Sequence, residues 1–311
     1  MYLVGIDGGA TKTLCLIGDE RGTVLSSGLS YGSNHQVIGK EQARASIQHA
    51  LNEALEKLNL TVNQIDYAVL GLAGADLPSD FTVLDEICHS IFHQAPFKII
   101  NDAWIGLRAG NPDNWGVVSI CGTGANAAGR TQDGREAILR GMSYELGNRG
   151  GGIDLLKDAL HYAFRSEEGT GPQTLLALEL PKLLGLSRMQ DLVETVLSQQ
   201  VAPEIIYAIP ILVFNLATQG DRVCQDLLVN MGRTLGEMAG GVIKRLGFAP
   251  EAEVPVTLVG SLFKGSNPLL LDEYTTTVHR VAPRARIEVA KAEPAYGAYL
   301  LALDHYASAA S

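Results

Sequence analysis

The chain has 311 residues, of which 46% are hydrophobic and 19% charged, and its formal net charge is −10. This length exceeds what a single hydrophobic core usually fills, so we expect two domains. The net negative charge argues against broad nucleic-acid binding, because phosphate backbones select a basic face. The sequence shows no basic and apolar leader and no run of about 18 apolar residues, which predicts a cytoplasmic protein without a membrane partner.

A glycine-rich turn comes directly after the first predicted strand. Residues 2–6 are apolar, and the sequence continues as Asp7-Gly-Gly-Ala-Thr-Lys-Thr13 before a second strand over 14–18. Because glycine lacks a Cβ, such a turn can expose backbone N–H groups, which bind phosphate oxygens together with threonine hydroxyls, while Asp7 can hold hydrated Mg²⁺. The spacing matches neither the P-loop nor the dinucleotide-binding fingerprint, both of which open a helix. For this motif alone, an ordinary β-turn capped by Asp7 is the alternative.

The first third of the chain alternates strands and helices. A third strand is expected at 23–28, and the spacing of apolar residues predicts the elements after it. The expected elements are a helix over 40–58, a strand over 65–72, a helix over 79–93, a strand over 97–100 and a short helix from Asp102. Three antiparallel strands and then this order of elements are typical of a ribonuclease-H-like half.

A second half restarts near Trp115 and repeats the beginning of the first. A strand over 117–121 runs into Gly122-Thr-Gly124, and a hairpin comes next. The similarity is one of element order, from which we infer a duplication. The remaining expected elements are strands at 125–131, 135–141, 254–259 and 286–290, and helices at 153–165, across 173–219, at 221–246 and at 294–305. The expected domains are 1–112, completed by a C-terminal helix over 294–311, and 113–293, which contains a helical insertion.

Asp102 is the candidate catalytic residue. Phosphoryl transfer needs an acceptor hydroxyl in line with the γ-phosphate and a carboxylate that orients this hydroxyl or accepts its proton. Asp102 stands at the end of an apolar strand and the start of a helix, where the strand ends of an α/β sheet converge on ligands. Its alternative role is that of a helix N-cap, for which Asp is favoured.

Asn34 and His35 stand in the polar loop Tyr31-Gly-Ser-Asn-His35. An amide side chain suits a sugar, since it can donate to one hydroxyl and accept from another. Capping of the loop is the alternative for Asn34. The residues alone leave both roles open.

Together these motifs resemble a known family. The strand ends at 7–13, 122–124 and 260–261, with Asp102 in Ile100-Asn-Asp-Ala103, are similar to the N-acetylglucosamine kinase branch of the sugar kinase, actin and heat-shock-chaperone ATPase superfamily. That grouping also holds the activator ATPases of benzoyl-CoA reductase and 2-hydroxyacyl-CoA dehydratases. The resemblance continues to Pro294-Ala-Tyr-Gly-Ala-Tyr-Leu-Leu-Ala302. It implies an α/β fold of two ribonuclease-H-like (actin-like ATPase) domains, with mixed sheets flanked by helices and an ATP cleft between them.

The resemblance also implies roles for the matching residues, with ATP and Mg²⁺ as cofactors. Asp102 matches the catalytic aspartate, and Asp7 matches the residue that faces Mg²⁺ through water. The positions expected to bind ATP are Gly8, Gly9, Thr11, Lys12, Thr13, Gly122, Thr123, Gly124, Gly220, Gly260 and Ser261. The positions expected to bind the sugar are Asn34, His35, Asp102, Gly141, Met142, Ser143 and Asn148. The family often has tryptophan where Met142 stands.

One loop departs from the family pattern. Where the family commonly has Gly-Asp-Glu-Gly-Ser, this chain has Gly147-Asn-Arg-Gly-Gly151. Arg149 could pair with an anionic substituent such as a lactyl carboxylate, which would suggest N-acetylmuramate as the acceptor. Equally, it could form a salt bridge with Glu145 or point into solvent, as exposed charges usually do. The sequence leaves these alternatives open.

The leading prediction is ATP-dependent phosphorylation of N-acetylglucosamine to its 6-phosphate, with Asp102 as the base. The protein is expected to be a homodimer, and its expected binding partner is a small-molecule sugar substrate. A kinase for N-acetylmuramate or glucosamine is one alternative, and an activator ATPase for a partner reductase or dehydratase is another. Such activators hold an iron–sulfur cluster between two subunits with two cysteines each. Cys121 stands just before a Gly-Thr-Gly turn, but the next cysteine is Cys224, too far along the chain. The four scattered cysteines form no Cys-X-X-Cys pair and indicate neither disulfides nor zinc.

Overall fold

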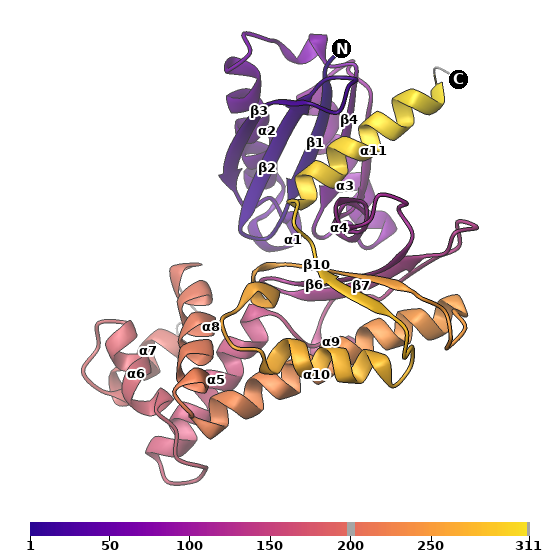
Figure 1. The fold of residues 1–311 in the computed structure, drawn as a ribbon. Helices are drawn as coiled ribbons and strands as arrows, with labels where there is room; N and C mark the ends of the chain where they lie inside the picture. The colour runs from indigo at the N-terminus through magenta and orange to yellow at the C-terminus, as the bar shows by residue number, and fades with distance from the viewer. Residues whose placement is uncertain (198–202, 310–311) are drawn as a thin grey trace. The chain divides into compact units, whose positions relative to one another are not determined.

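Two five-stranded sheets flanked by helices make up the protein (Figure 1). The computed structural model describes residues 1–197 and 203–309. By their internal contacts these residues form two compact units: unit 1 contains 1–118, 128–136 and 288–309, and unit 2 contains 119–127, 137–197 and 203–287. The domain boundaries expected from the sequence stay a prediction.

The first sheet has the order β3-β2-β1-β4-β5. Its strands are β1 (Leu3–Gly8), β2 (Lys12–Gly18), β3 (Val24–Tyr31), β4 (Tyr67–Leu72) and β5 (Phe97–Asn101). β1 pairs antiparallel with β2 and parallel with β4, so the predicted meander and the strands after it are confirmed. Asp7 lies beside Gly71 at the carboxyl ends of β1 and β4. In open α/β sheets, ligands bind at the loops that follow these strand ends.

Alternate residues of β1 face two different sets of helices, as strand geometry requires. Val4 and Ile6 join a core with α2 (Lys40–Glu56) and α3 (Pro78–Phe92). Leu3 packs on the other face, with α4 (Asp102–Gly110) and α11 (Pro294–Ala309). Figure 1 shows α11 lying across that face beside β1 and β4. At Gly5 a Cβ would come within 2.1 Å of the Tyr299 nitrogen, so only glycine lets α11 approach this closely.

The second sheet has the order β10-β9-β6-β7-β8. Its strands are β6 (Gly116–Cys121), β7 (Ala125–Arg130), β8 (Glu136–Ile138), β9 (Pro255–Val259) and β10 (Arg286–Val289). Counted along the chain, the first strand of each sheet is central, the second and third extend one side and the fourth and fifth the other. The repeated order agrees with the inferred duplication. β8 is shorter than predicted: it ends at Ile138, and Gly141, at the end of the predicted strand, adopts a φ of 66°.

Helices fill the rest of the second half. They are α5 (Gly152–Glu167), α6 (Leu176–Leu183), α7 (Met189–Leu197), α8 (Pro203–Thr218), α9 (Arg222–Leu246) and α10 (Leu269–His279). The helical region predicted across 173–219 thus consists of three helices, with 198–202 outside the described residues, as are 310–311 of the C-terminal helix. The sequence analysis missed α10, which stands between the fourth and fifth strands as α3 does in the first half. Asp221 caps α9 by accepting a hydrogen bond from Cys224 N, and Gly247 ends it.

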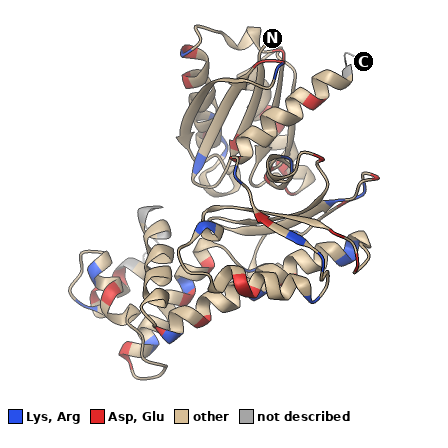
Figure 2. Ribbon diagram, in the orientation of Figure 1, with Lys and Arg blue, Asp and Glu red and all other residues tan. Residues whose placement is uncertain are grey.

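Short elements complete the fold. They are α1 (His35–Ile38) and the single turns of 3₁₀-helix η1 (Val62–Gln64), η2 (Tyr144–Leu146) and η3 (Ser261–Lys264). Lys and Arg are interspersed with Asp and Glu along the helices and strands (Figure 2). Within 1–197 and 203–309, no helix is both long and apolar enough to span a membrane.

Candidate functional site

The turn after β1 is held closely by the loop after β3. Gly9 N donates to Lys12 O at 2.9 Å, and Ser33 N donates to Gly9 O at 2.9 Å. A Cβ on Gly8 would lie 2.4 Å from Ser33 Oγ, so glycine is required for this approach. The structure therefore brings the predicted phosphate turn and the predicted sugar loop together within unit 1.

The side chains of this turn differ in what they offer to a ligand. Thr13 is buried and its hydroxyl donates to Tyr31 O at 2.8 Å, so its role is structural in this conformation. Thr11 is partly exposed. Lys12 is exposed and forms an ion pair with Glu293 at 2.8 Å. Of the predicted side-chain phosphate ligands, Thr11 and Lys12 are therefore the better placed.

Two carboxylates with raised pKa values lie at the strand ends of the first sheet. Burial raises the pKa of Asp7 to about 7, and the charge of Asp102 adds to the rise. Burial raises the pKa of Asp102 to about 6, and the charge of Asp76 adds to it. A carboxylate whose pKa lies near neutrality suits general base catalysis, since proton acceptance is then most effective at cellular pH.

Asn101, rather than Asp102, caps α4. Its side-chain oxygen accepts a hydrogen bond from Ala103 N at 3.0 Å, and Asp102 is the first residue of the helix. The alternative role of Asp102 as N-cap is therefore wrong. Asp102 is held in place as the first residue of α4, and the side-chain amide of Asn101 caps the helix.

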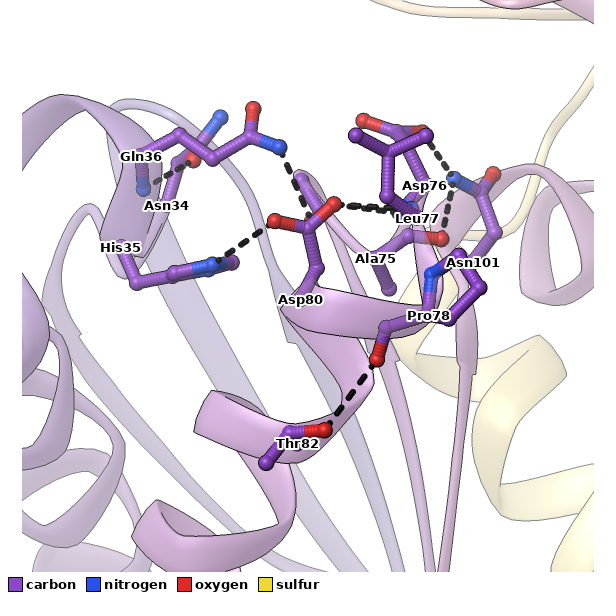
Figure 3. A network of polar contacts seen from close by, with 11 residues as sticks. Asn34, His35, Gln36, Ala75, Asp76, Leu77, Pro78, Asp80, Thr82 and Asn101 are labelled. Carbon is purple, nitrogen blue, oxygen red and sulfur yellow. Dashed lines mark hydrogen bonds and ion pairs between the residues drawn. The ribbon is translucent and has the colours of Figure 1, made fainter.

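The loop that carries Asn34 and His35 is tied to the loop after β4 (Figure 3). Asn34 Oδ1 caps α1 by accepting from Gln36 N at 3.0 Å, and Gln36 Nε2 donates to Gly74 O at 3.3 Å. His35 Nε2 lies 3.3 Å from Asp80 Oδ1. The capping alternative for Asn34 thus holds for its oxygen, which leaves its two amide N–H groups as the donors that a ligand could use.

Some buried side-chain polar atoms of the described residues lack a hydrogen-bond partner. Within the described parts of the chain, these atoms are Ser33 Oγ, His35 Nδ1, Asn114 Oδ1 and Asn148 Oδ1. Buried polar groups normally have partners, so an orphan atom calls for an explanation such as an unseen ligand. Two of the four belong to His35 and Asn148, and a third to Ser33 in the same loop as His35.

The predicted sugar loop of the second half is also ordered by glycine and amide contacts. Gly141 lies against the side chain of Asn126, where a Cβ would be 2.6 Å from Nδ2. Asn148 Nδ2 donates to Ala125 O at 3.0 Å. Met142 is partly buried, whereas Ser143 is exposed. The structure thus anchors the two ends of this loop on β7.

Arg149 pairs with Asp158 of α5 and not with Glu145. The carboxylate of Asp158 receives a hydrogen bond from the Arg149 guanidinium. The charge of this arginine is therefore balanced in part by a neighbouring carboxylate of α5.

A pocket of about 200 Å³ lies in unit 2 beside the Gly122-Thr123 turn. Its walls are mostly apolar, and its lining residues are Gly122, Thr123, Gly152, Tyr207, Pro210, Ile211, Phe214, Asn215, Ser261, Leu262, Gly265 and Ser266. The pocket brings together three residues that were predicted to bind ATP. Gly124, Gly220 and Gly260 do not line it, although Gly260 packs directly on Cys121 O.

Sequence reasoning missed the contribution of α8. This helix lines the pocket with residues three or four apart, from Tyr207 to Asn215, which therefore share one face. Tyr207 and Ile211 are 42% and 61% exposed. A signal was present, because apolar residues surround this helix on every side and one packing face cannot bury them all.

Known proteins resemble this chain over nearly its whole length. The N-acetylmuramic acid/N-acetylglucosamine kinase of Clostridium acetobutylicum is 28% identical over 301 residues, which are 97% of this chain and 98% of that protein. The N-acetyl-D-glucosamine kinase of Dictyostelium discoideum is 28% identical over 311 residues and 97% of each chain.

A solved structure described as an N-acetylglucosamine kinase, from Chromobacterium violaceum, matches with a TM-score of 0.77 at 22% identity, covering 97% of this chain and 98% of that one. The predicted fold class, two ribonuclease-H-like halves with mixed sheets flanked by helices, is confirmed. The cleft between the halves stays a prediction. The sequence pattern of the BadF/BadG/BcrA/BcrD ATPase family matches residues 4–302. The chain therefore belongs to the BadF/BadG/BcrA/BcrD ATPase family.

Proposed function

We propose that the protein transfers the γ-phosphoryl group of ATP to the 6-hydroxyl of an amino sugar, N-acetylglucosamine, with Asp102 as the base. The observation that carries this proposal is Asp102 itself. Its carboxylate stands at a strand end, on a capped helix, with a pKa raised by burial to about 6. Both full-length relatives are kinases of N-acetylated amino sugars.

The turn after β1 is the proposed site for the ATP phosphates. The N–H groups and hydroxyl around Gly8 to Thr11 would bind phosphate oxygens. Within the described residues, no group of three or more His, Cys, Asp or Glu side chains could hold a metal ion. A single carboxylate fits Mg²⁺ that keeps most of its water, so Asp7 would hold the ion through water. When bound, the ion neutralises charge on the phosphates.

The pocket beside α8 is the proposed site for the adenine base. Its apolar walls suit the faces of a planar ring, and Tyr207 and Phe214 offer aromatic surface. Asn215 and Ser261 supply the few polar groups that would fix the orientation of the base and ribose. The Gly122-Thr123 turn, next to this pocket, would then face the phosphates.

Truncating Tyr207 tests this pocket. Tyr207→Ala removes an aromatic wall that is partly exposed, so we expect ATP affinity to fall about fivefold to tenfold with little loss of stability. Isothermal titration with a non-hydrolysable ATP analogue measures the change. Leu178→Ala is the matched control, since Leu178 is an exposed apolar residue outside the pocket. Equal affinities for the two variants would contradict the assignment.

The sugar loops favour a neutral acceptor. Asn34 offers amide donors, and Asn148 offers a buried oxygen that accepts no hydrogen bond from the residues the structure describes. These groups match sugar hydroxyls and an acetamido group. Because Arg149 is already paired with Asp158, the structure gives no reason to rank the lactyl acid of N-acetylmuramate above N-acetylglucosamine.

In the proposed reaction the oxygen of the sugar 6-hydroxyl attacks the γ-phosphorus, and the hydroxyl proton moves to the Asp102 carboxylate. The bond from that phosphorus to the β,γ-bridging oxygen breaks, and ADP leaves with the bond's electron pair. Asp102 then releases the proton to solvent. The residues of the chain bind and orient the reactants and hold this proton, so most of the rate enhancement comes from positioning and electrostatics.

Replacing the base tests the function. Asp102→Asn should retain ATP binding and lose sugar phosphorylation by about 10²- to 10⁴-fold, since only the proton acceptor is removed. A coupled ADP assay across glucosamine, N-acetylglucosamine, N-acetylmannosamine, N-acetylmuramate and glucose identifies the acceptor in the wild type. Retained turnover in the variant would exclude Asp102 as base, and turnover with none of the five sugars would exclude the proposed substrate class.

An activator ATPase is the second candidate, and the cysteines disfavour it. Cys121 is 0% exposed and is the last residue of β6, so its thiol is not at a surface that a second subunit could share. The next cysteine along the chain, Cys224, is buried as well. Purified protein with stoichiometric iron would favour the activator instead. The expected homodimer and cytoplasmic location also stay proposals, which light scattering and cell fractionation can test.

A further inference from the structure

Asn101 joins the loop after β4 to the helix that carries the base (Figure 3). Its amide group donates to Asp76 Oδ1 at 2.9 Å and to Ala75 O at 3.3 Å. Its oxygen accepts from Ala103 N at 3.0 Å. Asn101 is only 5% exposed, so these three hydrogen bonds fix the orientation of its side chain. The first turn of α4 is thereby fastened to the loop that carries Asp76.

The hydrogen bond to Asn101 does not itself require a charge at position 76. An amide oxygen could accept the same bond, because Asn101 donates through a neutral NH₂ group. A carboxylate is less favourable here, since burial and the nearby charge of Asp80 raise the pKa of Asp76. A partly buried charge at a position where a neutral side chain would accept the same hydrogen bond is destabilising, and such residues are expected at functional sites. The charge of Asp76 therefore points to a role beyond packing.

We propose that Asp76 is a positioning residue for phosphoryl transfer: through Asn101 it fixes the first turn of α4, and its negative charge makes the Asp102 carboxylate a stronger proton acceptor. The inference rests on the proposed role of Asp102 as base. The raised pKa of Asp102, which comes from burial and then from the charge of Asp76, agrees with it.

Other charged groups near Asp102 can also affect its pKa. Asp7, at the end of β1, feels the charge of Asp102. Asp80, on α3, acts on Asp76 and lies beside His35. Other charged groups near α4 form ion pairs: Lys12 with Glu293, Arg108 with Asp304 of α11, and Arg130, which lies over the ring of Trp104 in α4, with Glu136. Asp76 is thus the nearby carboxylate that directly adjoins the cap of α4.

Two variants separate the charge from the hydrogen bond. Asp76→Asn removes the charge and keeps an oxygen that can accept from Asn101. Asn101→Ser keeps the charge and still caps α4, because serine is a good N-cap, but it loses the bond to Asp76. Asp85→Asn is the control, since it removes one exposed carboxylate from α3, outside the site. Melting temperatures establish that each variant is folded, and Asp76→Ser serves as a second uncharged variant.

The readout is the single-turnover rate of sugar phosphorylation from about pH 5 to about pH 9, which excludes product release. For Asp76→Asn we expect the acidic limb to move to lower pH by about one unit, with a plateau rate a few-fold lower and unchanged KM values. For Asn101→Ser we expect an unmoved limb and a plateau about tenfold lower. Asp85→Asn should match the wild type in both respects.

An acidic limb that stays at the wild-type pH in both Asp76→Asn and Asp76→Ser would overturn the proposal. So would a raised sugar KM with an unchanged rate, since Asp76 would then bind the sugar directly. Failure of the proposed function is recognised separately: Asp102→Asn would retain turnover, whatever the Asp76 variants do.

Discussion

Asn34 and Asp102 both stand at the start of a helix, and the structure gives them opposite roles in capping. Asn34 caps α1 with its side-chain oxygen. In α4 the N-cap is Asn101, so the Asp102 carboxylate does not cap the helix. Sequence could identify both positions, because Asn and Asp are favoured at helix starts and near ligands alike. It could not separate the two roles, since these depend on backbone angles that only the folded chain defines.

The raised pKa of Asp102 predicts that Asp102→Asn stabilises the protein at neutral pH in the absence of nucleotide. The folded-state pKa, about 6, lies above the ordinary value of 3.8, so ionisation costs stability. This cost is absent below about pH 4 and fully present above about pH 6, and an amide never incurs it. We expect a gain on the order of 1 to 3 kcal/mol at pH 7.5 and none at pH 4, measured by urea unfolding. A gain that persists undiminished at pH 4 would assign it to packing.

Some helices of the fold could be predicted from the sequence, and others could not. The spacing of apolar residues predicted α2, α3 and α9 as helices, because each has one apolar stripe. α10 was missed, yet the repeated order of strands would have required a helix between β9 and β10. The sequence showed that α8 has more apolar surface than one packing face can bury, but it could not show which of its faces lines the pocket, since pocket and core residues are apolar alike.

The packing of α9 on α10 predicts opposite effects for two glycines in one helix. A Cβ on Gly232 would lie 2.3 Å from Leu270 O, so Gly232→Ala must displace α10 and should destabilise the protein by about 1 to 3 kcal/mol. Gly241 has nothing within 4 Å of its Cβ position, so Gly241→Ala should stabilise by about 0.5 to 1 kcal/mol. Urea midpoints by circular dichroism measure both. Equal effects would show that α10 adjusts freely.

At the scale of the whole molecule, the order of elements was the most predictable property. Alternating strands, glycine turns and helical periodicity predicted the order of strands and helices along the first third of the chain and the restart near Trp115. Candidate site residues could be proposed from the sequence where a strand end carries glycine or acid, as at Asp7 and Asp102, and their roles stay a prediction. Residues such as Asp76 and Tyr207 escaped notice because their roles come from neighbours distant in the sequence.

The position of α11 predicts that unit 1 depends on the end of the chain. Removal of residues 294–311 would expose Leu3, Val69 and Ile105, which pack against this helix. We expect the shortened protein to lose cooperative thermal unfolding of unit 1, monitored by circular dichroism and limited proteolysis. A synthetic peptide of residues 292–309 added in trans should restore protection from proteolysis. A shortened protein that melts like the full chain would contradict this dependence.

The contact between β1 and α11 also has a consequence for synthesis on the ribosome. β1 leaves the ribosome long before Tyr299, yet a Cβ at Gly5 would collide with the backbone of Tyr299, so β1 needs α11 packed closely against it. Most of unit 2, from 137 to 287, is translated between them and can fold in the meantime. The apolar face of the first sheet therefore stays uncovered until α11 has been translated, which makes the nascent chain a client for chaperones that bind exposed hydrophobic strands.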